Sequence, residues 1–145
     1  MNVGDVIRTR KEIFSIRDDM TVHDAARYLR DHKVRAVGVL DAAGKLAGAI
    51  SQSDISDKVA AENKCPAWMR VSEIMTSKQL VTVTPERTLD DCLREMEKHG
   101  IFHLIVIGAE GEFQGMISVT DLLEVIASDH KERADMFEAY IFPQR

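Results

Sequence analysis

Two stretches of the sequence repeat one pattern of polar residues that could bind a nucleotide. Residues 48–55 read GAISQSDI and residues 115–122 read GMISVTDL, so each predicted strand ends in a serine and each following helix opens with a hydroxyl and an aspartate. The N–H groups at a helix N-terminus bind phosphate, and an aspartate beside them can accept hydrogen bonds from two ribose hydroxyls. The candidate residues are Ser51, Ser53, Asp54, Ser118, Thr120 and Asp121.

The same residues also have a purely structural interpretation. A hydroxyl at the N-cap followed by a carboxylate in the first turn stabilises a helix in any protein, and on this interpretation Ser53 and Thr120 are caps. The sequence contains no P-loop and no Gly-x-Gly-x-x-Gly fingerprint. The residues alone therefore leave nucleotide binding and helix capping both open.

Other chemistries find less support in the sequence. Cys65 falls in a predicted connector and Cys92 on the apolar face of a predicted helix, which gives neither a disulfide framework nor metal-ligand spacing. His99 and His103 are four residues apart, but Gly100 ends the helix that would bring them together, so no metal site is expected. No serine or cysteine has a base and an orienting group in a recognisable pattern. We therefore expect a protein that is not an enzyme.

Charge and hydropathy limit the class of partner. The formal net charge is −5, and no basic stripe is present, which argues against a nucleic-acid partner. The longest apolar run, residues 101–107, is too short to cross a membrane, and the N-terminus lacks the apolar core of a secretory signal. We expect a cytoplasmic protein with no membrane partner.

The polar pattern recurs because the chain is an internal repeat. Residues 16–61 align without a gap to residues 83–128, with 12 of 46 positions identical. Residues 3–7 (VGDVI) also match residues 71–75 (VSEIM) once one extra residue is allowed in the first copy. The second copy thus lies 67 positions after the first.

Each copy predicts a strand, a helix, two strands in a hairpin, and a second helix. Strands are expected at 13–16, 34–40 and 46–51 and at 80–83, 101–107 and 113–118. The first helix of each copy should begin after Thr21 or Thr88, and the second should begin near Ser53 or Thr120. The expected fold class is α+β, with two pseudo-symmetric β-α-β-β-α units packed through their sheets and a cleft along the seam.

The repeat also sets the predicted domain boundaries. These are unit 1 at 1–61, a connector at 62–70, unit 2 at 71–128 and a C-terminal helical tail at 129–145. Trp68, in the connector, is expected to pack back on the body of the protein.

The whole chain resembles a tandem pair of cystathionine β-synthase-type (CBS) domains, a Bateman module. The resemblance covers about residues 3–128 and rests on the paired openings VGDVI and VSEIM and on the segments TVHDAARYLRDHKVRAVGVLDAAGKLAGAISQSDI and TLDDCLREMEKHGIFHLIVIGAEGEFQGMISVTDL. The tail FEAYI is similar to tails of stand-alone bacterial members. The resemblance implies a regulatory module that binds AMP, ADP or ATP between its units, needs no cofactor, forms a homodimer and acts on a regulated protein partner. S-adenosylmethionine as the ligand, or a structural module that binds no ligand, are the alternatives.

The resemblance also implies roles for individual residues. Asp54 and Asp121 would hold ribose hydroxyls, and the neighbouring hydroxyl side chains, Ser51, Ser53, Ser118 and Thr120, would face ribose or phosphate. The family's basic position falls near Arg35 and Ala36 in the first copy and near Phe102 and His103 in the second, with His103 the better phosphate contact. The Asp121 site would include Thr9 and Phe14, and the Asp54 site Thr76 and Val81, whose backbone would meet adenine.

The sequence departs from the family pattern at one position in each copy. Members often have a proline before the valine of the second strand, where this chain has Gly38 and Ile105. Copy one also has a small residue, Ala36, and Gln52 where bulk or charge could help a ligand. We therefore expect the Asp121 site to be the better one.

Overall fold

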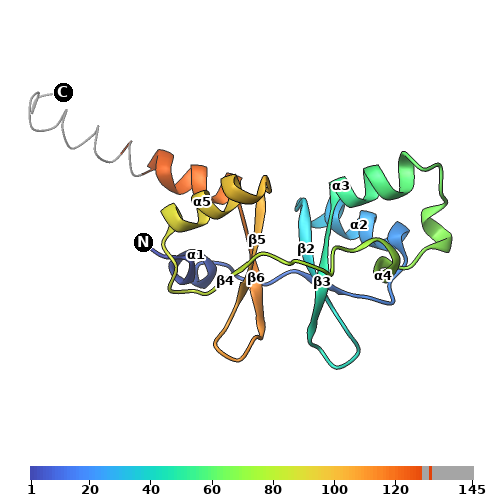
Figure 1. Ribbon diagram of the computed structural model, residues 1–145, viewed down its shortest axis with the longest axis horizontal. Coiled ribbons are helices and arrows are strands. Elements are labelled where there is room, and N and C mark those ends of the chain that lie inside the picture. Colours follow the sequence, from blue (N-terminus) through green and yellow to red (C-terminus); the bar gives the residue numbers. More distant parts are fainter. Residues whose placement is uncertain (129–130, 132–145) are drawn as a thin grey trace, which may run out of the picture.

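The computed structural model describes residues 1–128 and 131, so the predicted tail at 129–145 lies, residue 131 excepted, outside the described residues. The chain forms two similar α/β units whose sheets face each other, with helices on their outer sides (Figure 1). The first unit contains β1 (Ser15–Arg17), α2 (Val22–His32), β2 (Ala36–Leu40), β3 (Leu46–Ser51) and α3 (Gln52–Ile55), which continues as a π-helix over Ser56–Ala60. The second contains β4 (Thr82–Val83), α5 (Leu89–His99), β5 (His103–Ile107), β6 (Phe113–Ser118) and a helix over residues 119–128. The α+β fold class and the two-unit architecture are confirmed.

The two sheets have the same topology and the same irregularity. In each, the first strand runs parallel to the middle strand, and the middle strand pairs antiparallel with the third in a hairpin. The register shifts between Val39 and Leu40 in one hairpin and between Val106 and Ile107 in the other, which are equivalent positions. Gly44 and Gly111 take positive φ angles of 80° and 81° in the matching turns. The repeat seen in the sequence is therefore a repeat of backbone geometry.

The first long helix of each unit begins where the sequence predicts. The hydroxyls of Thr21 and Thr88 each accept the N–H three residues on, from Asp24 and Asp91, at 3.1 Å. The helices end at left-handed residues, Lys33 (φ 56°) and Gly100 (φ 64°). Gly100 thus stops α5 as predicted, whereas the first unit places a lysine in the same conformation.

The middle strands begin two residues later than predicted, at Ala36 and His103. The N–H groups of Val34 and Ile101 donate to the carbonyls of Leu29 and Met96, which closes the C-termini of the preceding helices. Because these groups complete the helix cap, they are not available to the sheet.

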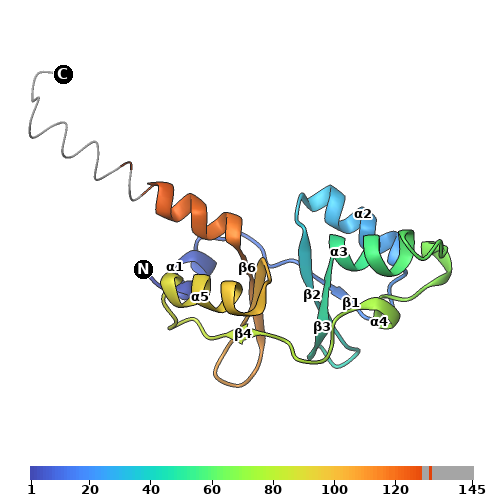
Figure 2. The same cartoon turned by 45° about the horizontal axis from the view of Figure 1, so that its top comes forward.

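Two short helices that the sequence did not predict open the two halves of the chain. They are α1 (Val3–Arg8) and α4 (Val71–Ile74). In both views α1 lies beside the second unit and α4 beside the first (Figures 1 and 2). The Val3 N–H donates to the Arg87 carbonyl at 2.9 Å, and the Val71 N–H donates to the Met20 carbonyl at 2.8 Å. Each unit is therefore completed by the opening helix of the other half.

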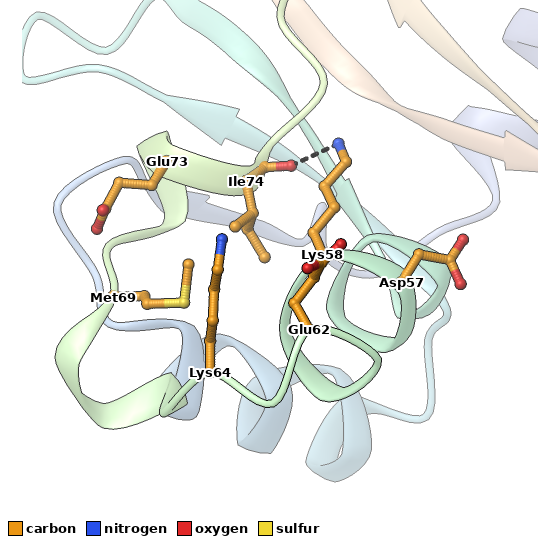
Figure 3. Close-up of a pocket in the computed structure, with 7 residues that line it drawn as sticks. All are labelled: Asp57, Lys58, Glu62, Lys64, Met69, Glu73 and Ile74. Atoms are coloured by element: carbon orange, nitrogen blue, oxygen red, sulfur yellow. Dashed lines mark hydrogen bonds between the residues drawn. The ribbon is translucent and has the colours of Figure 1, made fainter.

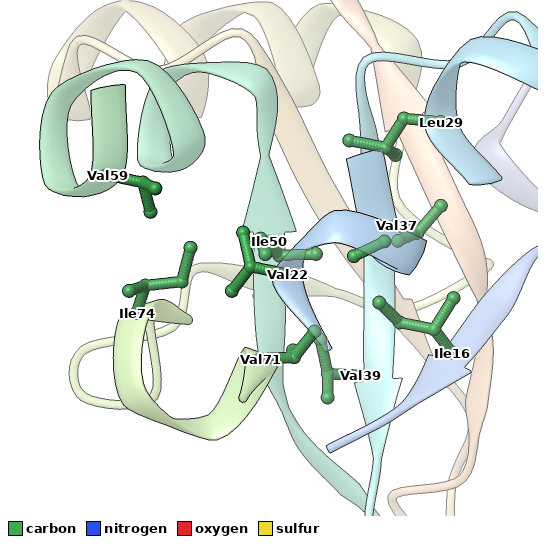
Figure 4. Packing of buried hydrophobic residues seen from close by; sticks show 10 residues of the cluster. Ile16, Val22, Leu29, Val37, Val39, Ile50, Val59, Val71 and Ile74 are labelled. Atoms are coloured by element: carbon green, nitrogen blue, oxygen red, sulfur yellow. The ribbon is translucent and has the colours of Figure 1, made fainter. Parts of the chain in front are cut away.

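The hydrophobic cores follow this exchange. Val71 and Ile74 of α4 pack with Ile50 and other side chains of the first unit (Figure 4). Val3 of α1, which is fully buried, belongs to the core of the second unit with Leu104 and Ile117. Neither core is complete without a segment from the other half of the sequence.

The seam between the sheets is close-packed at one position because a residue has no side chain. A Cβ on Gly38 of β2 would lie 2.5 Å from the Phe113 ring of β6. The counterpart of Gly38 in the second unit is Ile105, which is 3% exposed. Gly38 thus makes room for the Phe113 ring.

The connector contains a short 3₁₀ turn at Pro66–Trp68. Trp68 does not pack on the body as expected, since it is 85% exposed. Two N–H groups of the turn, those of Trp68 and Met69, bond within the turn itself, and it is the neighbouring Met69 that packs on the first core. The prediction for Trp68 was wrong because it took size and apolarity as sufficient for burial.

Candidate functional site

Asp121 and Ser118 form a reciprocal capping pair at the start of the helix over residues 119–128. The Ser118 N–H donates to Asp121 Oδ2 at 2.8 Å, and the Asp121 N–H donates to the Ser118 hydroxyl oxygen at 3.1 Å. This arrangement is the capping box, in which a side chain three residues after the cap bonds back to it. Ser118, the last residue of β6, is thus the cap, and the predicted cap Thr120 is exposed in the first turn.

The first unit repeats this geometry with Asp54 and Ser51. The Ser51 N–H donates to Asp54 Oδ2 at 2.9 Å, and the Asp54 N–H donates to the Ser51 hydroxyl at 3.2 Å. Ser53, predicted as the cap, is exposed. The prediction was wrong in both units for one reason: the capping box needs a spacing of three residues before the aspartate, and only Ser51 and Ser118 have it.

The two aspartates are neutralised by different parts of the chain. Lys58 Nζ lies 3.0 Å from Asp54 Oδ1 and also donates to the Ile74 carbonyl at 2.8 Å. Arg10 Nη2 donates to Asp121 Oδ2 at 2.8 Å from 111 residues away in the sequence. Sequence reasoning missed both cations: the Asp-Lys spacing of four residues could have indicated the first, but no local signal indicates the second.

Arg10 also holds the edge of the second sheet. It follows α1, and its other terminal nitrogen donates to the Met116 carbonyl of β6. Gly115 lies beneath this segment, because a Cβ there would meet Ile7 at 3.2 Å and Arg10 at 3.6 Å. The start of the chain therefore reaches the second unit, and the residue that contacts Asp121 is Arg10.

His103 lies close to Asp121, and Arg35 lies close to His103. His103 faces Ser118 directly across the β5–β6 ladder. Burial lowers the pKa of His103, the Asp121 carboxylate raises it and the Arg35 guanidinium lowers it further. Arg35 belongs to the first unit and lies close enough to His103 of the second to lower its pKa, so residues of both halves meet beside His103. In the first unit, Ala36 faces Ser51 at the position that His103 occupies in the second.

The other predicted site residues are more dispersed. Phe102 is 68% exposed. The Phe14 ring packs against Tyr28 and His32 of α2, with centroid distances of 6.3 and 4.6 Å, so only its backbone is left for the role predicted for it. The exposed Thr9 donates its hydroxyl to the Val6 carbonyl at the end of α1.

The Asp54 counterparts use their backbone to hold the structure together. Thr76 exchanges two hydrogen bonds of 2.9 Å with Ala49 of β3. The Val81 carbonyl accepts the Ile105 N–H at 3.2 Å, so this carbonyl is already bonded within the second unit. Thr76 and Val81 are the residues whose backbone was predicted to meet adenine, and these backbone groups are bonded within the protein.

Two surface hollows lie away from the aspartates. One, of about 380 Å³, lies between the end of the first unit, the connector and α4, and Lys58 donates to the Ile74 carbonyl at its edge (Figure 3). Its lining residues are Asp57, Lys58, Glu62, Lys64, Met69, Glu73 and Ile74. The other, of about 480 Å³, is lined by Gln79, Leu80, Val81, Thr82 and His99. Neither hollow includes Asp54 or Asp121.

The described part of the chain offers no cluster of three or more side chains that could hold a metal ion. Cys92 is buried, and burial raises the pKa of its thiol, which disfavours the reactive thiolate. Within the same residues, no helix is long and apolar enough to span a membrane.

Comparison with known proteins gives a consistent family match. Residues 3–61 and 71–128 each match the family model described as CBS domain. The mitochondrial CBS domain-containing protein CBSX3 of Arabidopsis thaliana is 32% identical over 126 residues, which cover 85% of this chain and 61% of that protein. The chain therefore spans less than two thirds of the length of this relative.

Solved structures share the fold over nearly their full length. A protein with CBS domains from Burkholderia ambifaria MC40-6 has a TM-score of 0.82 and 27% identity, with 89% of this chain and 96% of that chain covered. The CBS domain pair of protein MJ0100, in complex with 5′-methylthioadenosine and S-adenosyl-L-methionine, has a TM-score of 0.76 and 25% identity, with 87% and 99% covered.

Proposed function

The chain belongs to the CBS domain family, and from this we propose that it is a regulatory module that binds an adenosyl compound beside Asp121. AMP, ADP and ATP are the preferred ligands. The observation that carries the proposal is the group of side chains around Asp121: a carboxylate at a helix start, with Arg10 bonded to it, His103 close to it and Arg35 close to His103. A carboxylate suits the ribose hydroxyls, and the two guanidinium groups suit phosphate.

The proposed mechanism is a shift in conformation. The site is built from both halves of the chain, since Arg10 precedes the first unit, Arg35 lies in it and Asp121 lies in the second. A ligand held by all three would favour one arrangement of the seam, and a ligand can shift an equilibrium only through such differential contacts. A regulated protein or a second copy of the chain would read the change, and homodimer formation is part of this proposal.

S-adenosylmethionine or methylthioadenosine is a second candidate. The neighbouring structure of MJ0100 holds both compounds, which supports an adenosyl ligand without phosphate. A module that binds no small molecule is a third, supported by the capping bonds that already engage Asp54 and Asp121 and by the position of the two hollows.

Calorimetric titration separates these candidates. The protein is titrated with AMP, ADP, ATP, S-adenosylmethionine and methylthioadenosine, and the Asp121→Ala and Asp54→Ala variants serve as a matched pair. We expect Asp121→Ala to abolish binding of the preferred nucleotide and Asp54→Ala to have the smaller effect. Binding should also stabilise the fold by about 2.7 kcal/mol at a free ligand concentration of 100 Kd. Binding by Asp121→Ala as tight as that of the unmodified chain would refute the site, and heatless titrations without thermal stabilisation would favour the third candidate.

A further inference from the structure

Arg10 connects the start of the chain to the candidate site through two separate hydrogen bonds. One terminal nitrogen donates to Asp121 Oδ2 at 2.8 Å and the other to the Met116 carbonyl. The Arg10 and Asp121 side chains are 28% and 31% exposed, so the pair is only partly shielded from solvent. A ligand can therefore reach this ion pair from the solvent.

Among the described residues, Asp54 of the first unit has no arginine partner. The openings of the two halves are offset by 68 residues, which places Lys78 at the position of Arg10, and the residue 67 positions before Met116 is Ala49. Ala49 is bonded by the backbone of Thr76, and Asp54 is neutralised by Lys58 from its own helix. In both units a segment from the other half bonds to the edge strand, at Met116 and at Ala49. Only in the second unit does that segment also place a guanidinium beside the aspartate.

The bonds at Asp121 define what a ribose would have to displace. Oδ2 already accepts the Ser118 N–H and Arg10. Two ribose hydroxyls compete with Arg10 for this carboxylate, whereas the Ser118 N–H belongs to the helix cap. The Arg10 guanidinium stays charged at every physiological pH. Its separation from Asp121 would therefore cost free energy unless another anion took the place of the carboxylate.

A phosphate group supplies that other anion. Guanidinium groups bind phosphate through two parallel hydrogen bonds, with a strength at least equal to that of a single bond to carboxylate. Arg35 of the first unit and His103 of the second lie close enough to influence each other electrostatically. In one ligand, the phosphate can thus bind Arg10 while the ribose hydroxyls bind Asp121.

We propose that Arg10 determines the specificity of the Asp121 site: it exchanges the carboxylate for the phosphate of an adenosine phosphate and leaves Asp121 to the ribose. Adenosine compounds that lack phosphate must compete with Arg10 and gain nothing from its release. The site therefore favours AMP over methylthioadenosine. This inference rests on the proposed function.

The test compares AMP with methylthioadenosine on the Arg10→Ala variant. Loss of one charge-assisted contact should weaken AMP binding by about tenfold or more. Methylthioadenosine should bind equally well or better, because its ribose no longer competes for Asp121. Arg10→Lys keeps the charge but not the forked guanidinium, so its AMP affinity should lie between those of the unmodified chain and of Arg10→Ala. Arg8→Ala, at an exposed arginine of α1, serves as the control.

The outcomes distinguish the inference from the proposed function. Equal loss of both ligands in Arg10→Ala, with Arg10→Lys losing both to the same degree, would show that Arg10 only supports the fold of the site, and unchanged binding of both would show that it takes no part. Either result overturns the inference and leaves the site at Asp121. If no adenosyl compound binds the unmodified chain, or if Asp121→Ala binds normally, the proposed function fails and the inference fails with it.

Discussion

The two CBS units share a serine–aspartate frame but differ in the charge that balances it. Ser51 with Asp54 and Ser118 with Asp121 superimpose in their bonding, down to the same reciprocal cap. Lys58 comes from within one helix turn, whereas Arg10 comes from the opposite end of the chain. The frame is conserved between the copies because helix capping needs it, and the cations are free to differ because capping does not. The two units therefore differ in the residues around the frame rather than in the frame itself.

A second difference lies in the strands that form the seam. The middle strand of the first unit carries Gly38 and Ala36 where that of the second carries Ile105 and His103. Gly38 leaves room for the Phe113 ring of the opposite sheet, and Ala36 faces Ser51 where the second unit has His103 facing Ser118. At the seam, the second unit thus contributes the polar side chain of His103, whereas the first unit contributes Gly38, which makes room for Phe113, and Arg35.

The largest expected effect tests whether the two units unfold together or separately. Ile50→Ala and Ile117→Ala remove equivalent side chains that are 0% exposed, and each should cost about 2–5 kcal/mol. Because α1 and α4 are exchanged, both variants should shift one common unfolding transition, measured by urea denaturation and far-UV circular dichroism. Leu123→Ala, at a residue 56% exposed, is the control and should change stability by less than about 0.5 kcal/mol. Two separate transitions, only one of which moves in each variant, would contradict this expectation.

A medium effect tests the shared frame. Ser51→Ala and Ser118→Ala should each destabilise the protein by about 1 kcal/mol, because each leaves an N–H at the helix start without its acceptor. Ser53→Ala and Thr120→Ala, at the exposed neighbouring hydroxyls, should stay within about 0.5 kcal/mol of the unmodified chain. Thermal unfolding of the four variants measures this. Equal losses at the neighbouring hydroxyls would restore them as the caps.

The smallest effect tests the contribution of His103, which has no titratable counterpart in the first unit, to the pH dependence of stability. The pKa of His103 in the folded protein is lowered from 6.5, mainly by burial, so the unfolded chain takes up a proton at a higher pH than the folded one. Stability should therefore fall as the pH drops from about 6.5 toward the lower folded-state pKa, and it should be unaffected by this group above that window. His103→Gln should flatten the decline, whereas His23→Gln, at an exposed residue of α2, should not. Denaturant midpoints at pH 7.5 and 5.5 provide the measurement, and identical slopes in all three proteins would exclude His103 as the source.

The fold could be predicted largely because its signals are local and occur twice. Thr21 and Thr88 cap their helices as expected, and the 67-residue offset places every strand of one unit on a strand of the other. The helices α1 and α4 escaped prediction because six and four residues are too few to show a helical period. The Asn2–Asp5 capping box was the available signal for α1.

The candidate site was less accessible to sequence reasoning. Asp121, Ser118 and His103 could be found because they belong to the repeated pattern or to the strand beside it. Arg10 could not, since a pair of residues 111 positions apart depends on how the whole chain packs. The cap was misassigned because the pattern Ser-x-Ser-Asp offers two hydroxyls, and the nearer one was chosen although the capping box needs the one three residues before the aspartate.

The exchange of opening helices has a consequence for synthesis on the ribosome. Helix α1 is synthesised before both sheets, and its partners in the second sheet extend to residue 118. At roughly 5–20 residues per second, α1 waits on the order of ten seconds for them. Throughout that interval the apolar face of Val3, Val6 and Ile7 lacks its native cover, so nascent chains at this stage should be the form most in need of a chaperone.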